Sequence, residues 1–113
     1  MTADQFRTLA LSCAEAVESS HQGRADFRVR KKIFATLDEA DAIGTLKLQP
    51  EQQEILIAAF GDAFFPANGS WGAKGWTRLR LSGLSSDDVA GGMRMAWANV
   101  AQKKLVASQG QSA

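Results

Sequence analysis

The sequence is poor in the residues that build metal centres and disulfide frameworks. Cys13 is the only cysteine and His21 the only histidine among 113 residues, which excludes an internal disulfide and a zinc site of paired thiolates. No stretch approaches the roughly 18 apolar residues of a membrane-spanning helix, and the first residues lack a basic region followed by an apolar run. We therefore expect a cytoplasmic protein without metal, other cofactor or membrane partner.

The sequence also has no large excess of positive over negative charge, or of negative over positive. Thirteen Lys and Arg against twelve Asp and Glu leave a net charge of +1, which excludes a histone-like or ribosomal type of protein. The charges are nevertheless clustered: segment 24–32 has five basic residues and one acid, 74–80 has three basic residues and no acid, and 38–62 has six acids and one lysine. If the two basic segments lie side by side, the molecule is dipolar.

Apolar residues recur at helical spacing in three segments. The first predicts a helix from Ala3 to Glu15 with a capping box at its start. The second predicts a helix from Pro50 to Phe60. The third begins with an N-cap at Ser85 and acids in its first turn, and its expected core stripe is Val89, Met93, Trp97 and Val100.

Two glycines, Gly91 and Gly92, lie inside the third predicted helix. Each costs about 1 kcal/mol of helix stability relative to alanine. We therefore expect this turn of the helix to pack closely against another element.

Period-two alternation predicts strands between and after these helices. The periodicity changes at Val17, and alternating segments follow at 27–30, 33–37, 43–48 and 76–81. Residues 64–72 lack a period and predict a loop anchored by aromatic side chains. The expected fold is a single α/β (α+β) domain over residues 1–107, an antiparallel sheet with helices packed on one face in the order α-β-β-β-β-α-β-α. Residues 108–113 would be a frayed polar tail.

An ordered series of short motifs supports this fold independently. The series consists of Phe27-Arg28-Val29-Arg30, Lys32-Ile33-Phe34-Ala35-Thr36-Leu37, Leu46-Lys47-Leu48, Pro50-Glu51-Gln52, Phe64-Phe65-Pro66, Gly75-Trp76-Thr77-Arg78-Leu79, Ala96-Trp97, Val100-Ala101 and Lys104. It resembles the MmcQ/YjbR family of small bacterial proteins. The resemblance implies a YjbR-like domain with an antiparallel sheet and helices packed against it. It implies little about function, because the family is described as uncharacterised and its comparison with "double wing" DNA-binding proteins is an analogy of fold.

The residues that could perform nucleophilic or metal chemistry favour structural roles. Cys13 falls on the apolar stripe of the first helix with Phe6 and Leu9, where a thiol is a small buried hydrophobe and an inert one. His21 has no second ligand type near it, so a hydrogen-bonded structural histidine is expected. The sequence therefore favours a binding protein over an enzyme.

Three glycines spaced three residues apart, Gly69, Gly72 and Gly75, surround Lys74 and suggest a phosphate-binding loop. Such loops require a helix N-terminus directly after them, whereas a strand is expected here, and neither the Walker A nor the dinucleotide motif is matched. The glycines therefore predict a tight turn that lets Trp71 and Trp76 pack against the body.

Alternation in the strands gathers basic side chains on one face of the sheet. In 76–81 the residues Trp76, Arg78 and Arg80 share one face, and Phe34 is a further aromatic candidate for it. Cations that neutralise phosphates beside a ring that stacks on a base are what a nucleic-acid surface requires. The predicted nucleic-acid-binding residues are Arg28, Arg30, Lys47, Lys74, Trp76, Arg78 and Arg80. The competing interpretation, favoured by the low net charge, is a solvated face whose arginines pair with Glu51, Glu54 or Asp41.

Two other classes of function stay open. A protein-interaction or homodimerising module would use exposed aromatics such as Phe64, Phe65 and Trp71. A small-ligand binder or enzyme would use a cleft near His21, Lys74 and Trp76.

Overall fold

The structure, a computed structural model, describes residues 1–21 and 24–101. The expected tail at 108–113 and the end of the expected domain at residue 107 lie outside this range. The helices and strands are, in chain order, α1 (Ala3–Leu11), β1 (Val17–His21), β2 (Arg24–Val29), β3 (Lys32–Asp38), β4 (Ile43–Lys47), α2 (Pro50–Phe60), β5 (Phe64–Pro66), α3 (Gly69–Ala73), β6 (Trp76–Arg80) and α4 (Ser86–Val100), with 3-10 turns η1 (Gly61–Ala63) and η2 (Leu81–Gly83).

The predicted mixed α/β class is confirmed, and the differences are local. Helix α1 ends at Leu11, four residues before the predicted end, and Glu15 has a φ of 61°, so the chain turns there into β1. The predicted loop at 64–72 instead contains the short strand β5 and the start of α3. Both are too short for periodicity to reveal, because three strand residues and five helix residues span little more than one repeat.

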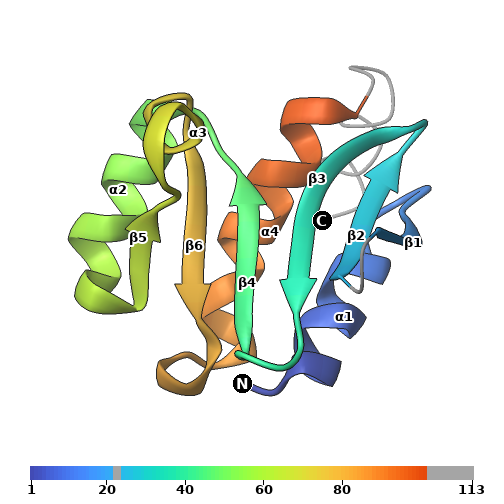
Figure 1. Ribbon diagram of the computed structural model, residues 1–113, viewed down its shortest axis with the longest axis horizontal. Helices are drawn as coiled ribbons and strands as arrows, with labels where there is room; N and C mark the ends of the chain where they lie inside the picture. Colours follow the sequence, from blue (N-terminus) through green and yellow to red (C-terminus); the bar gives the residue numbers. More distant parts are fainter. Residues whose placement is uncertain (22–23, 102–113) are drawn as a thin grey trace.

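The six strands form one antiparallel sheet in the order β1-β2-β3-β4-β6-β5. The first four strands follow one another as a meander, and β6 then pairs with β4 while β5 takes the outer edge. Strands β2 and β6 are therefore separated by β3 and β4. The two basic segments therefore do not pair with each other in the sheet (Figure 1).

Helices α1 and α4 cover one face of the sheet. Figure 1 shows α4 passing behind the sheet, where it packs on β3 and β4 with α1 beside it. The shared core is apolar and at most 1% exposed at Phe6, Phe27, Leu37, Leu46, Leu79, Val89, Met93 and Trp97. The indole Nε1 of Trp97 donates to the Ala14 carbonyl at 2.9 Å, so the one polar atom of this ring is satisfied. The predicted core stripe of α4 is confirmed.

A bulge in β3 changes the predicted alternation. Phe27 pairs with Ala35 and Arg28 with Ile33, which leaves Phe34 as an extra residue between the two pairs. Phe34 and Ala35 are both fully buried. The prediction that Phe34 shares the open face with the basic residues is wrong, because one extra residue moves the following side chains to the other face.

The two glycines of α4 differ in their surroundings. A Cβ on Gly92 would lie 3.1 Å from Leu56 and 3.2 Å from Leu46, so the predicted close packing is confirmed there. Gly91 is exposed, and a Cβ on it would meet nothing within 4 Å. The same prediction is therefore wrong for Gly91.

None of the helices within the described ranges has the length and apolar character needed to cross a membrane.

Substitution of Trp97 by alanine tests the core. We expect Trp97→Ala to lower the free energy of unfolding by roughly 3 to 5 kcal/mol, because a large buried ring is replaced by a cavity. Trp71, whose residue surface is 60% exposed, provides the matched control: Trp71→Ala should change the free energy by no more than about 1.5 kcal/mol, the worth of one exposed aromatic contact. Urea titration followed by far-UV circular dichroism measures both, and a Trp97 effect below about 1 kcal/mol contradicts the assignment.

Candidate functional site on the open face of the sheet

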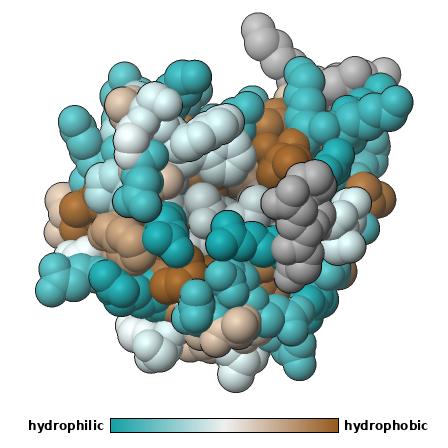
Figure 2. All heavy atoms as spheres, in the orientation of Figure 1, coloured by the Kyte–Doolittle hydropathy of each residue, from teal (hydrophilic) through white to brown (hydrophobic). Residues whose placement is uncertain are grey.

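The face of the sheet that α1 and α4 leave uncovered is hollowed into a groove of about 520 Å³. Side chains from β2, β3, β4 and β6 form its floor, and the segment around α3 forms one wall. Figure 2 views this face and shows mainly hydrophilic side chains with small hydrophobic areas among them. The lining residues are Arg24, Ile33, Thr36, Asp38, Ile43, Thr45, Ala67, Asn68, Trp71, Trp76 and Arg78.

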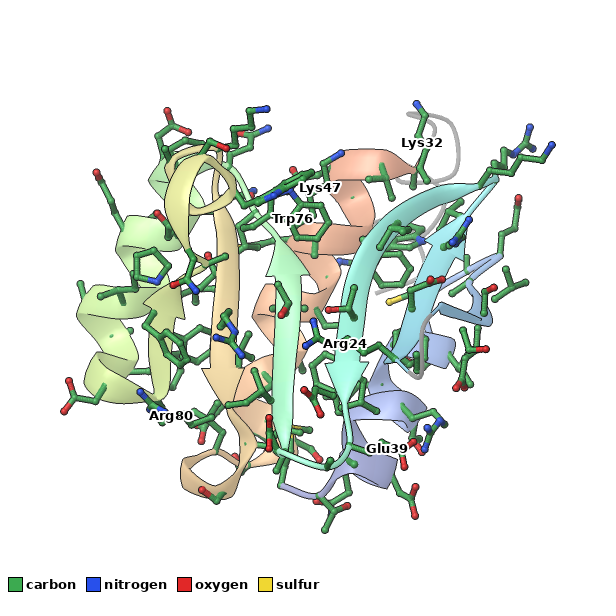
Figure 3. The ribbon with its side chains drawn as sticks, in the orientation of Figure 1. Arg24, Lys32, Glu39, Lys47, Trp76 and Arg80 are labelled. Atoms are coloured by element: carbon green, nitrogen blue, oxygen red, sulfur yellow. The ribbon has the colours of Figure 1, made fainter. Side chains whose placement is uncertain are left out.

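Two tryptophans from different elements form the aromatic part of the groove. Trp71 on α3 and Trp76 on β6 meet edge to face, with ring centroids 6.0 Å apart and an interplanar angle of 81°. The Nζ of Lys74 lies 5.6 Å from the Trp71 ring centroid, and that of Lys47 lies 5.9 Å from the Trp76 centroid. Figure 3 shows Lys47 beside Trp76 at one end of β4. Each ring therefore has a cation next to it.

A buried polar network holds this wall in place. The side-chain amide of Gln53 on α2 donates to the Gly72 carbonyl at 3.2 Å, to the Trp76 carbonyl at 3.1 Å and to Thr77 Oγ1 at 3.1 Å. Thr77 Oγ1 in turn donates to the Gly75 carbonyl at 2.8 Å. Gln53 and Thr77 are buried, so these groups have no access to water as an alternative partner.

Two glycines allow the backbone around α3 to approach this closely. A Cβ on Gly72 would lie 2.0 Å from the Ala67 carbonyl oxygen, and one on Gly75 would lie 2.0 Å from that of Leu48. Gly75 also has a φ of 109°, which other residues avoid. These positions explain Gly72 and Gly75 by packing, whereas Gly69 has open space around it and a φ of 63°. The predicted plain turn instead contains the five-residue helix α3. Trp76 is half-buried as expected, whereas Trp71 is exposed and contacts Trp76 edge to face.

The cations of β6 lie beside an aromatic residue of β5. Arg78 pairs in register with Phe65, and the guanidinium carbons of Arg78 and Arg80 lie 5.5 Å and 4.3 Å from the Phe65 ring centroid. Thr77 and Leu79 are fully buried on the opposite face. Within the part of the chain that the structure describes, Arg78, Arg80, Lys47 and Lys74 form no ion pair.

Arg28 and Arg30 lie away from the groove and have carboxylate partners. Arg28 donates to both oxygens of Asp26, at 2.7 Å and 3.1 Å, and this hydrogen bonding raises the pKa of the Arg28 guanidinium. Arg30 stands in the β2–β3 turn with a φ of 50° and lies 3.4 Å from Glu15. The structure therefore does not bring these two arginines together with Trp76.

Arg24 lines the groove and was not predicted as a site residue. Its guanidinium lies 3.9 Å from the Asp38 carboxylate, and its side chain is 71% exposed. Figure 3 shows Arg24 reaching over the centre of the sheet. Strand β2 starts at Arg24, and alternation with Asp26 and Arg28 would have placed it on the same face.

Of the aromatics expected for a protein-interaction surface, one is misplaced. Phe64 is 1% exposed and belongs to the core, so the prediction that it is exposed is wrong; Phe65 is half-buried and Trp71 is exposed. The sequence also suggests a small-ligand cleft near His21, Lys74 and Trp76. The backbone of His21 lies opposite Arg24, on the edge strand β1. Three strands separate β1 from β6, the strand that carries Trp76.

Cys13 lies outside the groove. It lines a smaller cavity of about 230 Å³ between α1 and α4, with Met93, Arg94 and Trp97. The thiol is half-buried rather than fully buried, and its Sγ lies 3.8 Å from the Leu9 carbonyl oxygen. Burial raises the pKa of Cys13 to about 11, although Arg94 acts in the opposite direction.

In the described parts of the chain no three His, Cys, Asp or Glu residues gather as metal ligands.

A six-stranded antiparallel sheet with α1 and α4 on one face and, on the other, a groove walled by the α3 segment defines a mixed α/β domain. A family model described as YjbR matches residues 9–99. The chain belongs to the YjbR family, and the resemblance seen in its motifs is confirmed.

A solved structure has the same fold. The crystal structure of Deinococcus radiodurans protein DR2400, which has a DUF419 domain, matches with a TM-score of 0.75 at 19% sequence identity over 98% of this chain and 86% of that one. At this identity the likeness shows the fold alone. No curated protein matches the chain.

The raised pKa of Cys13 predicts an inert thiol. With a pKa of about 11, about one thiol in ten thousand is ionised at pH 7, and only the thiolate is nucleophilic. We expect a disulfide reagent to react about 300-fold more slowly with the native protein at pH 7 than with the urea-unfolded chain, whose thiol has a pKa near 8.5. The native rate should keep rising with pH up to about 11, and equal native and unfolded rates at pH 7 contradict the assignment.

The Gln53 network can be tested by Gln53→Met, which keeps the side-chain length and removes the donors. We expect a loss of about 1 to 3 kcal/mol in the free energy of unfolding, because buried acceptors lose a partner, together with a changed fluorescence of the two groove tryptophans. Glu54→Met, at an exposed position of the same helix, is the control and should change neither. Equal effects of the two substitutions would show that Gln53 does not position the groove wall.

Proposed function

We propose that this YjbR-family protein is a binding protein that holds nucleic acid on the open face of its sheet. The observation that supports this best is that Arg78 lines the groove, Lys47 and Lys74 lie beside its two tryptophans, and Arg80 follows on β6, all four without carboxylate partners among the described residues. These cations lie beside the rings of Trp71 and Trp76 and of Phe65. Such a surface offers phosphates a set of cations and offers bases an aromatic platform.

The low net charge of the chain does not weaken this proposal. The carboxylates on the open face, Asp26 and Asp38, already face Arg28 and Arg24. Other acidic residues lie in the helices, such as Glu51 and Glu54 on α2. Segregation of the two signs leaves the groove basic, and a field of this kind attracts a polyanion even when the net charge is near zero.

The groove also argues for binding rather than catalysis. The thiol of Cys13 is on the other side of the sheet, between the helices. The described groove residues are two arginines, two tryptophans, two threonines, one asparagine, three aliphatic residues and one carboxylate that faces an arginine. This set can recognise an anion, whereas it contains no nucleophile with an adjacent base.

Measurement of oligonucleotide affinity against salt tests the proposal. We expect labelled single- and double-stranded oligonucleotides to bind at about 50 mM salt, where electrostatic binding is strong, with log affinity falling linearly against log salt. Conversion of Arg78 and Arg80 to alanine should weaken binding for every sequence and reduce the slope by up to about 1.4, at about 0.7 per phosphate contact on single strands.

The matched control is Arg94→Ala. Arg94 is exposed on α4, on the helix-covered side of the sheet, so its loss should leave affinity and slope nearly unchanged. Fluorescence anisotropy measures all variants. Dissociation constants weaker than about 1 mM for both strand forms, or equal effects of the Arg94 and Arg78 changes, would rule out the proposal.

A further inference from the structure

We infer that the groove binds one unpaired nucleobase, so that the protein selects single-stranded over duplex nucleic acid. This rests on the proposed function and adds the form of the ligand. The starting observation is Trp71, an aromatic residue that is 60% exposed and lines the groove. A large exposed apolar ring on a short helix held by a buried network is a costly arrangement that phosphate binding alone does not require.

The floor of the groove combines the apolar side chains of Ile33 and Ile43 with polar groups that can meet the edge of a base. Thr36 and Thr45 lie directly opposite each other on β3 and β4, and Arg78 lies opposite Thr45 on β6. The side chains of Thr36, Thr45 and Asn68 form no hydrogen bond with any residue in the described ranges. Hydroxyl and amide groups of this kind donate and accept, as the edges of nucleobases require.

The volume of the groove suits one small aromatic group. At about 520 Å³ it falls within the range of about 300 to 1,000 Å³ that is typical of small-ligand sites. In a duplex both faces of each base are stacked on its neighbours, so the Trp71 and Trp76 rings cannot reach them unless the base is unstacked at a cost. A single strand offers bare base faces without that cost.

The cations around the rings place the phosphates of such a strand. Lys74 and Lys47 lie beside Trp71 and Trp76, and Arg78 and Arg80 follow along β6 on the same face. A base stacked on Trp71 or Trp76 therefore has lysines close to its own phosphate. The arginines further along β6 are available to the phosphates of the neighbouring nucleotides. This continuity favours a strand over an isolated nucleotide.

Three DNA ligands of equal length separate base binding from phosphate binding: a single strand, a duplex of the same sequence and an abasic strand that keeps the phosphates. For the unmodified protein we expect the single strand to bind about 5- to 100-fold more tightly than the abasic strand, the range that one base stacked on a protein ring contributes. Trp71→Ala should remove this ratio and leave the affinity for the duplex and the abasic strand unchanged. Trp71→Phe, which keeps a ring, should retain most of it.

The outcomes distinguish the inference from the proposal on which it rests. If all three ligands bind with equal affinity, or if Trp71→Ala weakens all three alike, base binding is wrong while phosphate binding on the open face stands. If none of the three binds at about 50 mM salt, the proposed function fails and this inference fails with it. A free nucleoside monophosphate that binds as tightly as the single strand would show that the groove takes a nucleotide, and would overturn selection of a strand.

Discussion

Burial of the apolar stripe of α4 against β3 and β4 is the constraint on which the rest of the structure depends. Met93 and Trp97 are at most 1% exposed, and Gly92 lets the helix approach Leu46 and Leu56. Because strand side chains alternate, an apolar residue directed to this core leaves its neighbours on the other face, except at the bulge of β3, where Phe34 and Ala35 are both buried. No described helix of comparable length covers that face, so its residues are free to contact a ligand.

The groove forms because elements that are distant in sequence meet beside this open face. Gln53 of α2 connects to the carbonyls of residues 72 and 76, which ties the α3 segment to β6. Trp71 is thereby placed above a floor made by Thr36 and Thr45. The network leaves no buried polar group unsatisfied, because every buried side-chain nitrogen and oxygen of the described residues has a hydrogen-bond partner.

Membership of the YjbR family and likeness to DR2400 establish the fold but not the ligand. The argument about function therefore comes from charge and geometry. Arg28 is held by Asp26 and Arg30 by Glu15, whereas the cations near the groove contact aromatic rings. Arg24 is the groove cation that faces a carboxylate, Asp38. A cation beside a ring keeps its hydrogen-bond donors available to an anion.

The sequence by itself determined the helices at 50–60 and 86–100, the inward and outward faces of β6, and the family, because periodicity and motifs are local properties of the chain. The predictions that Phe34 lies on the open face and that Phe64 is exposed are wrong, because both are buried. Sequence reasoning also missed α3 and the place of Arg24 in the groove. A bulge, a three-residue edge strand and the insertion of β6 beside β4 arise from packing between distant segments. Only the tertiary structure decided which cations share a face with Trp71 and Trp76, because hydrogen bonding between strands, rather than order along the chain, sets their neighbours.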